Sequence, residues 1–198
     1  MIVIKTDVLY IDLDNVVFDT ISTIKQMYDE DFRLYDEYKW IPTHMIKHYD
    51  FSELHYMTPE KLMSYFSSGH FFDNLQYQEA AEATIAYLSR YYLIVFVSIG
   101  TPENLKGKRE WVDAFNKLWR VNAEFIGVTK NDKTHLDLSG GVLIDDEMKN
   151  LVNSSADINI CFGTYEWNYD YGGLRMNSWT EIKKYLEEEV KQRVVRNN

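Results

Sequence analysis

The sequence predicts an α/β fold in which helices cover both faces of a parallel sheet and a small helical cap is inserted after the first strand. Two observations support this fold class. Five short apolar runs rich in strand-forming residues alternate with segments of helical periodicity, which is typical of a parallel sheet. A long aromatic stretch of mostly helical pattern then interrupts this alternation directly after the first run.

The strands and helices of the core follow from these patterns. Apolar side chains recur at helical spacing in residues 79–91 and 108–119. Near the C-terminus, Ser178 and Glu181 have the spacing of a capping box, which predicts the start of a final helix. The predicted strands span residues 7–11, 93–97, 124–128, 142–144 and 158–162.

The cap is predicted from the aromatic residues and helical patterns between the first two strands. We expect a cap at residues 19–75 and a core domain that comprises residues 1–18 and 76–198. Thr58 followed by Pro59 marks the start of one helix inside the cap. Because this long segment is inserted directly after the first strand, we expect a cap or lid rather than a second independent domain.

The composition favours a folded protein that does not bind long nucleic acids. Hydrophobic residues make up 45% and aromatic residues 15% of the 198 residues, which is enough for a sizeable core. The net charge of −10 disfavours a surface for long nucleic acids, because such surfaces are basic. A local group of lysines and a metal ion can still bind a small anion.

The sequence also bears on the cellular compartment. Cys161 is the single cysteine, so no internal disulfide can form. The N-terminal residues MIVIKTD lack the apolar core of a signal peptide, and no apolar run approaches the length that spans a membrane. We therefore expect a cytoplasmic protein without membrane contact, and we leave a homodimer open.

Polar side chains with acid or base chemistry follow four of the predicted strands. The carboxyl ends of parallel strands meet at one edge of a sheet, so these side chains are expected to converge in one crevice. Converging carboxylates repel one another unless a cation lies between them, and oxygen ligands without cysteine or histidine favour Mg²⁺. The residues are Asp12 and Asp14 after the first strand, Ser98 after the second, Lys133 after the third, and Asp145 and Asp146 after the fourth.

Together these residue types can carry out phosphoryl transfer. One carboxylate can attack phosphorus and form an aspartyl-phosphate, and a second carboxylate two residues on can act as general acid and base. Lys133 and the hydroxyl of Ser98 can bind the phosphoryl oxygens. Each motif alone is more often a solvated strand end, a turn or a helix cap. The prediction therefore depends on their occurrence together.

The motifs YIDLDN, FVSIG, TKNDKT and VLIDD, in this order, resemble the haloacid dehalogenase (HAD) superfamily of phosphohydrolases. More narrowly, the segments FFDNLQYQEAAEATIAYL, GKREWVDAF and NSWTEIKKYL are similar to segments of 5′(3′)-deoxyribonucleotidases. The resemblance covers most of the chain and is weakest in the cap. It implies a Rossmann-like core and a Mg²⁺-dependent phosphatase that forms an aspartyl-phosphate and acts on (deoxy)ribonucleoside monophosphates.

The resemblance also implies roles for the acidic residues. Asp12 would be the nucleophile and a metal ligand. Asp14 would be the general acid and base, with its backbone carbonyl on the metal. Asp146 would bind the metal directly, and Asp145 would support the metal site from its outer shell.

For the phosphate and the rest of the substrate, the resemblance implies that Ser98 binds the phosphate and that Lys108 and Lys133 neutralise it. The chain departs from animal relatives at Thr20, where they carry an aromatic residue that stacks on the base. It also departs at residues 98–102, where SIGTP replaces the usual Thr-Ser-Pro. We expect the aromatic loop GTYEWNYDYGG to flank the mouth of the pocket, and we expect the pocket to be lined by Phe18, Thr20 and Trp40.

Three alternatives to a nucleotidase remain at this point. The phosphatase could act on another small phosphorylated metabolite, or on the end of a polynucleotide. The acidic composition weighs against the second of these. The chain could also be a non-catalytic binding module with the same fold, although no motif residue is replaced by an inert one.

Overall fold

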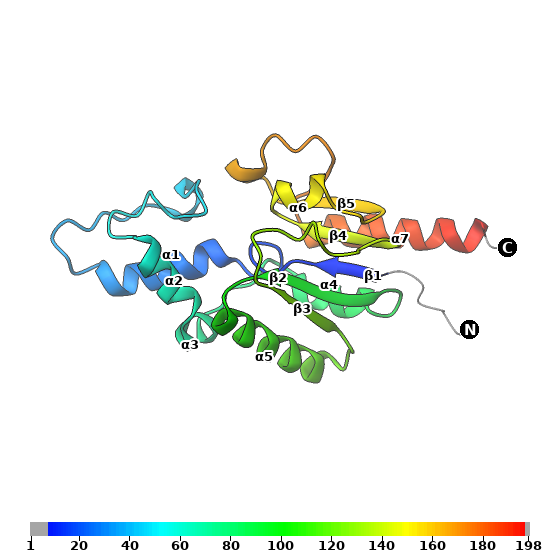
Figure 1. Cartoon of the computed structure of the whole chain (residues 1–198), viewed down its shortest axis with the longest axis horizontal. Helices are drawn as coiled ribbons and strands as arrows, with labels where there is room; N and C mark the ends of the chain where they lie inside the picture. The colour runs from blue at the N-terminus through cyan, green and yellow to red at the C-terminus, as the bar shows by residue number, and fades with distance from the viewer. Residues whose placement is uncertain (1–7, 197–198) are drawn as a thin grey trace.

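The core of the molecule is a six-stranded parallel sheet with the strand order β3-β2-β1-β4-β5-β6 (Figure 1). The structure, a computed structural model, describes residues 8–196, with side chains to residue 190. Adjacent strands are all parallel, so each connection crosses over the sheet. The strands are β1 (Val8–Ile11), β2 (Leu93–Ile99), β3 (Glu124–Val128), β4 (Gly141–Asp145), β5 (Ile158–Phe162) and β6 (Leu174–Met176).

Five of these strands confirm the sequence-based prediction, and β6 is an addition to it. The bounds of β3 and β5 agree with the prediction, whereas β2 continues for two residues beyond residue 97. Position 7, the first of the predicted first strand, lies outside the described residues. β6 has only three residues and carries a charged side chain, so it offers no apolar run from which it could be predicted.

The two faces of the sheet are covered unequally. The faces alternate along each strand, so that Leu9 and Ile11 belong to one hydrophobic cluster whereas Tyr10 packs on the opposite face. The larger cluster includes residues of three helices, α4 (Ala81–Leu88), α5 (Pro102–Trp119) and α7 (Trp179–Arg196). The other face is covered by α6 (Met148–Val152) and by Leu136 and Leu138 of the loop before β4.

Local sequence explains where these helices begin. Thr101 caps α5, since its hydroxyl accepts a hydrogen bond from the amide of Asn104 at 3.3 Å, and Pro102 occupies the first turn. The predicted start of α7 is confirmed, because Ser178 Oγ accepts a hydrogen bond from the amide of Glu181 at 3.2 Å. None of the described helices is long and apolar enough to cross a membrane.

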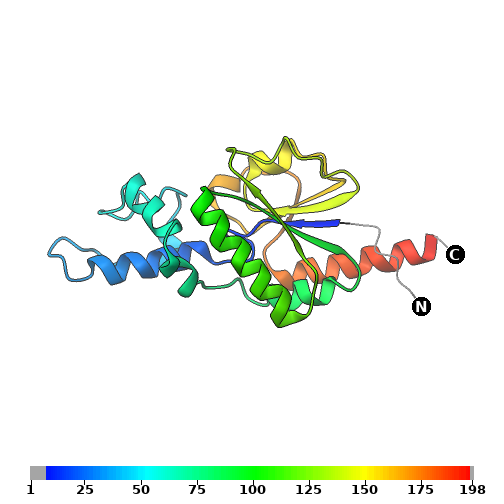
Figure 2. The same ribbon diagram turned by 60° about the horizontal axis from the view of Figure 1, so that its bottom comes forward.

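The chain between β1 and β2 forms a helical cap with its own hydrophobic cluster. It contains α1 (Thr20–Phe32), η1 (Thr43–Met45), α2 (Pro59–Phe66) and α3 (Gly69–Asp73). The predicted helix start at Thr58 is confirmed, because its hydroxyl accepts a hydrogen bond from the amide of Lys61 at 3.1 Å. Figures 1 and 2 both show the cap as a lobe beyond the carboxyl ends of the strands.

The cap is attached to the core domain along α5. Asn104 of α5 is buried and donates a hydrogen bond from Nδ2 to the carbonyl oxygen of Phe66 at 2.8 Å. Further along the helix, Gly107 lies against Phe72 so closely that any side chain at this position would overlap the aromatic ring. These contacts hold the cap over the edge of the sheet at which the predicted acidic residues emerge.

Candidate active site

A cavity of about 730 Å³ lies where the cap faces the carboxyl ends of the strands. Asp12, Asp14, Lys133 and Asp146 line its core side. The cap contributes the apolar side chains Tyr49, Met63 and Phe66 to the opposite wall. The cavity therefore joins a charged floor to an apolar wall, as expected for a ligand with a charged and an apolar end.

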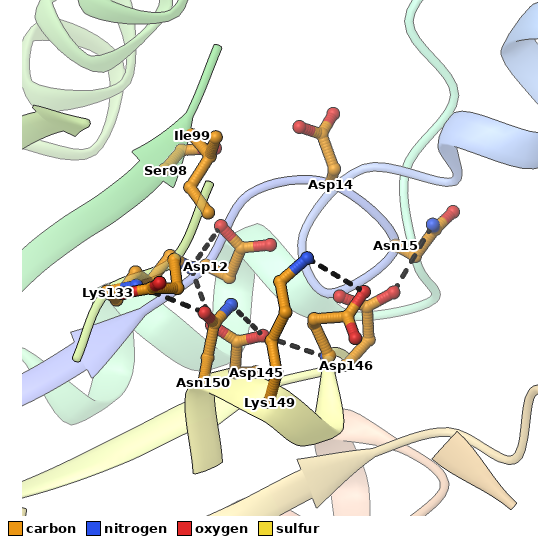
Figure 3. A network of polar contacts seen from close by, with 12 residues as sticks. Asp12, Asp14, Asn15, Ser98, Ile99, Lys133, Asp145, Asp146, Lys149 and Asn150 are labelled. Atoms are coloured by element: carbon orange, nitrogen blue, oxygen red, sulfur yellow. Dashed lines mark hydrogen bonds and ion pairs between the residues drawn. The ribbon is translucent and has the colours of Figure 1, made fainter. Parts of the chain in front are cut away.

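Three carboxylates lie close together in Figure 3, and two of them, Asp12 and Asp146, line this cavity. Asp12, Asp145 and Asp146 each offer an oxygen, and these oxygens all lie within 4.8 Å of one another. The geometry follows from the sheet, because β1 and β4 are neighbours and the amide of Asp12 donates to the carbonyl oxygen of Ile144 at 2.9 Å. Residues more than 130 positions apart are thereby brought together, as the sequence predicted.

Lys133 is buried beside these carboxylates. Its Nζ lies 2.7 Å from Asp12 Oδ1, in an ion pair outside hydrogen-bonding geometry, and it donates a hydrogen bond to Asp145 Oδ2 at 2.5 Å. Burial lowers the pKa of this ammonium, but Asp12 and Asp145 outweigh that effect and hold the pKa above its ordinary value. Lys133 is therefore a permanently charged partner of the predicted nucleophile.

Asn150 of α6 fixes both members of the Lys133–Asp145 pair. Its Oδ1 accepts a hydrogen bond from the amide of Lys133 at 3.1 Å, and its Nδ2 donates to Asp145 Oδ1 at 3.1 Å. Sequence reasoning missed this residue. The signal was its position four residues after Asp146, which places it on the inner side of the short helix after the acidic pair.

The pKa values of the carboxylates indicate a deficit of positive charge. Burial raises the pKa of Asp12 to about 6; Lys133 opposes this shift, and Asp145 and Asp14 add to it. Burial also raises the pKa of Asp146 well above its ordinary value, and the charges of Asp12 and Asp145 raise it further. Within the described part of the chain, Asp12 Oδ1 accepts no hydrogen bond.

These observations fit a divalent cation. The four buried carboxylates of the site and the two buried lysines, Lys108 and Lys133, carry a formal charge of −2, which one divalent ion balances. The donors are all hard oxygens, and hard oxygens favour Mg²⁺ over Zn²⁺. The acidic group at the ends of β1 and β4 is therefore suited to bind a metal ion.

Asp14 lies apart from the three clustered carboxylates (Figure 3). Its Oδ1 accepts a hydrogen bond from the hydroxyl of Thr20 at 3.0 Å, and its Oδ2 is paired with the ammonium of Lys108. The turn that carries it continues through Asn15, whose φ of 54° is in the left-handed region that asparagine tolerates. Thr20 and Lys108 thus hold the Asp14 carboxylate at the cavity wall, apart from the group of Asp12, Asp145 and Asp146.

Ser98 and Lys108 stand behind Asp14. The ammonium of Lys108 donates to Ser98 Oγ and to the carbonyl oxygen of Ile99, both at 2.9 Å, and both side chains are buried. Neither belongs to the residues that line the cavity, whereas Ile99, Gly100 and Thr101 do. The chain at the end of β2 therefore lines the cavity from Ile99 onward, and not at Ser98.

The three residues predicted to line the substrate pocket do not line this cavity. Phe18 is fully buried in the core domain, where its ring meets that of Trp111 edge-on with centroids 4.9 Å apart. Thr20 is buried beneath Asp14. Trp40 is 66% exposed and lines a separate hollow on the cap, near Lys25. The aromatic wall instead comes from Tyr49 and Phe66.

The aromatic loop after β5 reaches the site as the sequence suggested. Trp167, in η2 (Glu166–Asn168), donates a hydrogen bond from Nε1 to Asp146 Oδ2 at 3.1 Å. Asn168 donates from Nδ2 to the carbonyl oxygen of Asp146 at 2.8 Å. Sequence reasoning placed this loop at the mouth but did not identify these two residues as partners of the acidic group.

Comparison with solved structures shows the same fold at low sequence identity. A predicted phosphatase from Clostridium acetobutylicum matches with a TM-score of 0.63 at 15% identity, over 93% of this chain and 100% of that chain. A HAD-superfamily hydrolase of subfamily IA from Geobacter sulfurreducens matches with a TM-score of 0.57 at 13% identity, over 91% and 96% of the two chains. The HAD-type hydrolase YfnB from Bacillus subtilis, solved with magnesium bound, matches with a TM-score of 0.53 at 11% identity, over 92% and 99%.

The sequence comparisons identify the family. No curated protein shows significant sequence similarity to the chain. A family model described as "5' nucleotidase, deoxy (Pyrimidine), cytosolic type C protein" matches residues 6–193, which is nearly the whole chain. The order of the motifs, the carboxylates gathered at the strand ends and this match lead to one conclusion. The chain belongs to the family of 5′ nucleotidases, deoxy (pyrimidine), cytosolic type C, and it has the fold of HAD-superfamily hydrolases.

Proposed function

We propose that this enzyme uses Mg²⁺ to hydrolyse nucleoside monophosphates, with deoxyribonucleotides as its preferred substrates. The observation that carries the proposal is the group of Asp12, Asp145 and Asp146 around one point at the floor of the cavity, with Lys133 buried beside it. The description of the family supports the nucleotide substrate. A cavity of about 730 Å³ is of the size that accommodates such a ligand.

Asp12 and Asp146, with Asp145 and the backbone carbonyl of Asp14, would hold the metal ion. Bound there, the ion would neutralise negative charge on the substrate phosphate and on the carboxylates. Lys133 would complete this neutralisation as charge develops on the phosphoryl oxygens. Since Lys133 already touches Asp12, it would also hold the nucleophile in its charged form.

In the reaction, a carboxylate oxygen of Asp12 would attack phosphorus and form an aspartyl-phosphate while the bond to the nucleoside oxygen breaks. Asp14, protonated at that moment, would give its proton to the leaving oxygen. The same carboxylate would then take a proton from a water molecule, which attacks the phosphorus and releases Asp12. Thr20 and Lys108 support this role because they hold the Asp14 carboxylate at the cavity wall.

The cap supplies the part of the cavity that suits a nucleoside. The rings of Tyr49 and Phe66 are nearly parallel, at an interplanar angle of 16° with centroids 6.5 Å apart, and both line the cavity. A base placed against either ring would gain stacking energy on the order of 1 kcal/mol.

We also propose the division into a core of residues 1–18 and 76–198 and a cap of residues 19–75, which the separate hydrophobic clusters support. The word cytosolic in the family description supports a cytoplasmic location.

A phosphate-release screen tests the proposed substrate class. The purified protein would be incubated with matched ribo- and deoxyribonucleoside 5′- and 3′-monophosphates, sugar phosphates and a 5′-phosphorylated oligonucleotide, with Mg²⁺ or with a chelator. We expect release from nucleoside monophosphates that requires Mg²⁺, with the deoxyribonucleotides turned over best. Faster release from sugar phosphates or from the oligonucleotide would contradict the substrate assignment, and no release from any of them would favour a binding module.

The pKa shifts predict how pH affects the metal-free protein. Because the pKa of Asp12 is higher in the folded protein than its ordinary value of 3.8, the folded state binds this proton more tightly than the unfolded chain. The stabilisation is fully present below pH 3.8 and is lost as the pH rises through about 6. We therefore expect the Tm in chelator to fall over this range, relative to the Tm in Mg²⁺. If the Tm at neutral pH were the same in Mg²⁺ and in chelator, the proposed metal site would be contradicted.

A further inference from the structure

The loop between β5 and β6, residues 163–173, touches both the acidic site and the cap. Two of its aromatic rings, those of Tyr165 and Trp167, are stacked with centroids 4.6 Å apart and an interplanar angle of 3°. Both pack against the hydrophobic cluster of the cap. The hydroxyl of Tyr165 donates a hydrogen bond to the carbonyl oxygen of Asn15 at 3.2 Å, in the turn after Asp14. The loop therefore lies between the two parts of the molecule that enclose the cavity.

Trp167 has a separate contact on each side. On the core side, its indole Nε1 donates to Asp146 Oδ2 at 3.1 Å. On the cap side, its ring meets that of Tyr49 edge-on, at 84° with centroids 5.7 Å apart. Tyr49 is itself part of the cavity wall. One side chain thus connects a predicted metal ligand with the wall against which a base would stack.

The hydrogen bonds to Asp146 leave one of its oxygens for the ion. Asn15 Nδ2 also donates to Asp146 Oδ2, at 3.4 Å. Among the described residues, both side-chain hydrogen bonds to this carboxylate therefore end on Oδ2, and Oδ1 stays available for a metal ion. Of the two donors, Trp167 is closer, and it is the one that also contacts the cap.

Hydrogen bonds and an ion pair hold the loop at its base and at its tip. Arg175 of β6 donates to the carbonyl oxygens of Gly163 and Asn168, each at 2.5 Å. It also donates to Asn168 Oδ1 at 2.7 Å, while Nδ2 of the same asparagine holds the backbone of Asp146. At the rim, Lys47 of the cap pairs with Glu166 at 3.3 Å. The base of the loop is thus anchored to the sheet, and its tip is in contact with the cap.

We propose that Trp167 is a positioning residue: its indole N–H orients the Asp146 carboxylate for the metal ion, and its ring supports Tyr49 in the cavity wall. The position of the cap is thereby coupled to the geometry of the metal site. The inference rests on the Mg²⁺-dependent activity proposed above. Groups that orient metal ligands typically change metal affinity by 10- to 100-fold when they are replaced.

The test separates the two contacts of Trp167 with two variants. Trp167→Phe removes the N–H and keeps an aromatic ring, whereas Trp167→Leu removes both. Mg²⁺ affinity is measured without substrate, as the Mg²⁺ concentration that gives a fixed increase in Tm over the metal-free protein. We expect this concentration to rise about 10-fold in both variants. At saturating Mg²⁺, kcat should return close to the wild-type value, and KM for the nucleotide should rise in Trp167→Leu only.

The matched control is Trp119→Phe, which removes an indole at the far end of α5 and should leave the Mg²⁺ titration unchanged. If Trp167→Phe needs the same Mg²⁺ concentration as the wild type for this increase in Tm, and Mg²⁺ stabilises the wild type, the inference is overturned and the proposed function stays intact. A wild-type protein whose Tm does not respond to Mg²⁺ would contradict the proposed function itself, and the inference with it.

Discussion

The variant Asp12→Asn is expected to lose essentially all phosphatase activity, by at least about 10³-fold in kcat, while it retains its fold. The amide cannot form the aspartyl-phosphate, and no second carboxylate can replace it. Asp145 is already hydrogen-bonded to Lys133 and Asn150, and Asp14 is held by Thr20 and Lys108 at the cavity wall. The measurement is phosphate release at saturating nucleotide and Mg²⁺.

The fold of this variant should survive because the substitution removes a charge whose burial is unfavourable. The pKa of Asp12 is raised because burial disfavours the charged form of this side chain when no metal ion is bound. We therefore expect a Tm in chelator at neutral pH that is no lower than that of the wild type. Asp113→Asn, on the exposed side of α5, is the control with the same chemical change. Turnover that persists in Asp12→Asn would refute the assignment of the nucleophile.

The charged floor of the cavity was predictable because it depends on only two regularities. Each acidic pair follows directly on an apolar run, and neighbouring parallel strands end at the same edge of a sheet. Asp12 and Asp146 could therefore be placed together without knowledge of the connecting chain. The same reasoning placed Lys133 near them, although its two carboxylate partners followed only from the structure.

The apolar wall was not predictable in the same way. The cap has short helices joined by irregular segments, so its aromatic residues show no period that separates inner from outer positions. Phe18 and Trp40 were plausible by type, yet one is buried in the core domain and the other is largely exposed. Tyr49 lies in an irregular segment before α2, where sequence alone gives no direction to a side chain.

The loop that carries Trp167 shows a third situation, in which the segment was predictable and its contacts were not. Its glycine-rich ends and its aromatic content indicated a loop at the mouth of the site. The contact with Asp146 depends on the anchoring of the loop by Arg175, which belongs to the short strand β6 that the sequence did not reveal. Because the sequence did not predict β6, the hydrogen bond between Trp167 and Asp146 could not be predicted either.

Lys133→Met is expected to lose both stability and activity, because it removes the cation buried beside the carboxylates. Methionine fills a similar volume, so the effect should reflect charge rather than packing. Breaking a buried ion pair by removing one partner costs about 3–5 kcal/mol, since the remaining charges stay buried without compensation. We expect a loss of this order in the free energy of unfolding, measured with urea at neutral pH in chelator.

The pH dependence of this loss identifies its cause. In the variant, Asp12 lies beside Asp145 without the ammonium that now pairs with both, so the pKa of Asp12 in the folded state should rise further. A raised pKa stabilises the folded state at low pH, and this stabilisation is lost as the pH rises. The difference in stability between wild type and variant should therefore shrink as the pH is lowered through the pKa of Asp12, at about 6 in the wild type.

Mg²⁺ should act on this variant in the same direction as protons, because a divalent ion can restore part of the missing positive charge. We expect Mg²⁺ to raise the Tm of Lys133→Met by more than it raises that of the wild type, although phosphatase activity stays lost without the ammonium that faces the phosphoryl oxygens. Lys117→Met, at an exposed position of α5, is the control. A loss of stability that is equal at acidic and neutral pH, and insensitive to Mg²⁺, would show that Lys133 contributes packing and not the charge balance on which the site depends.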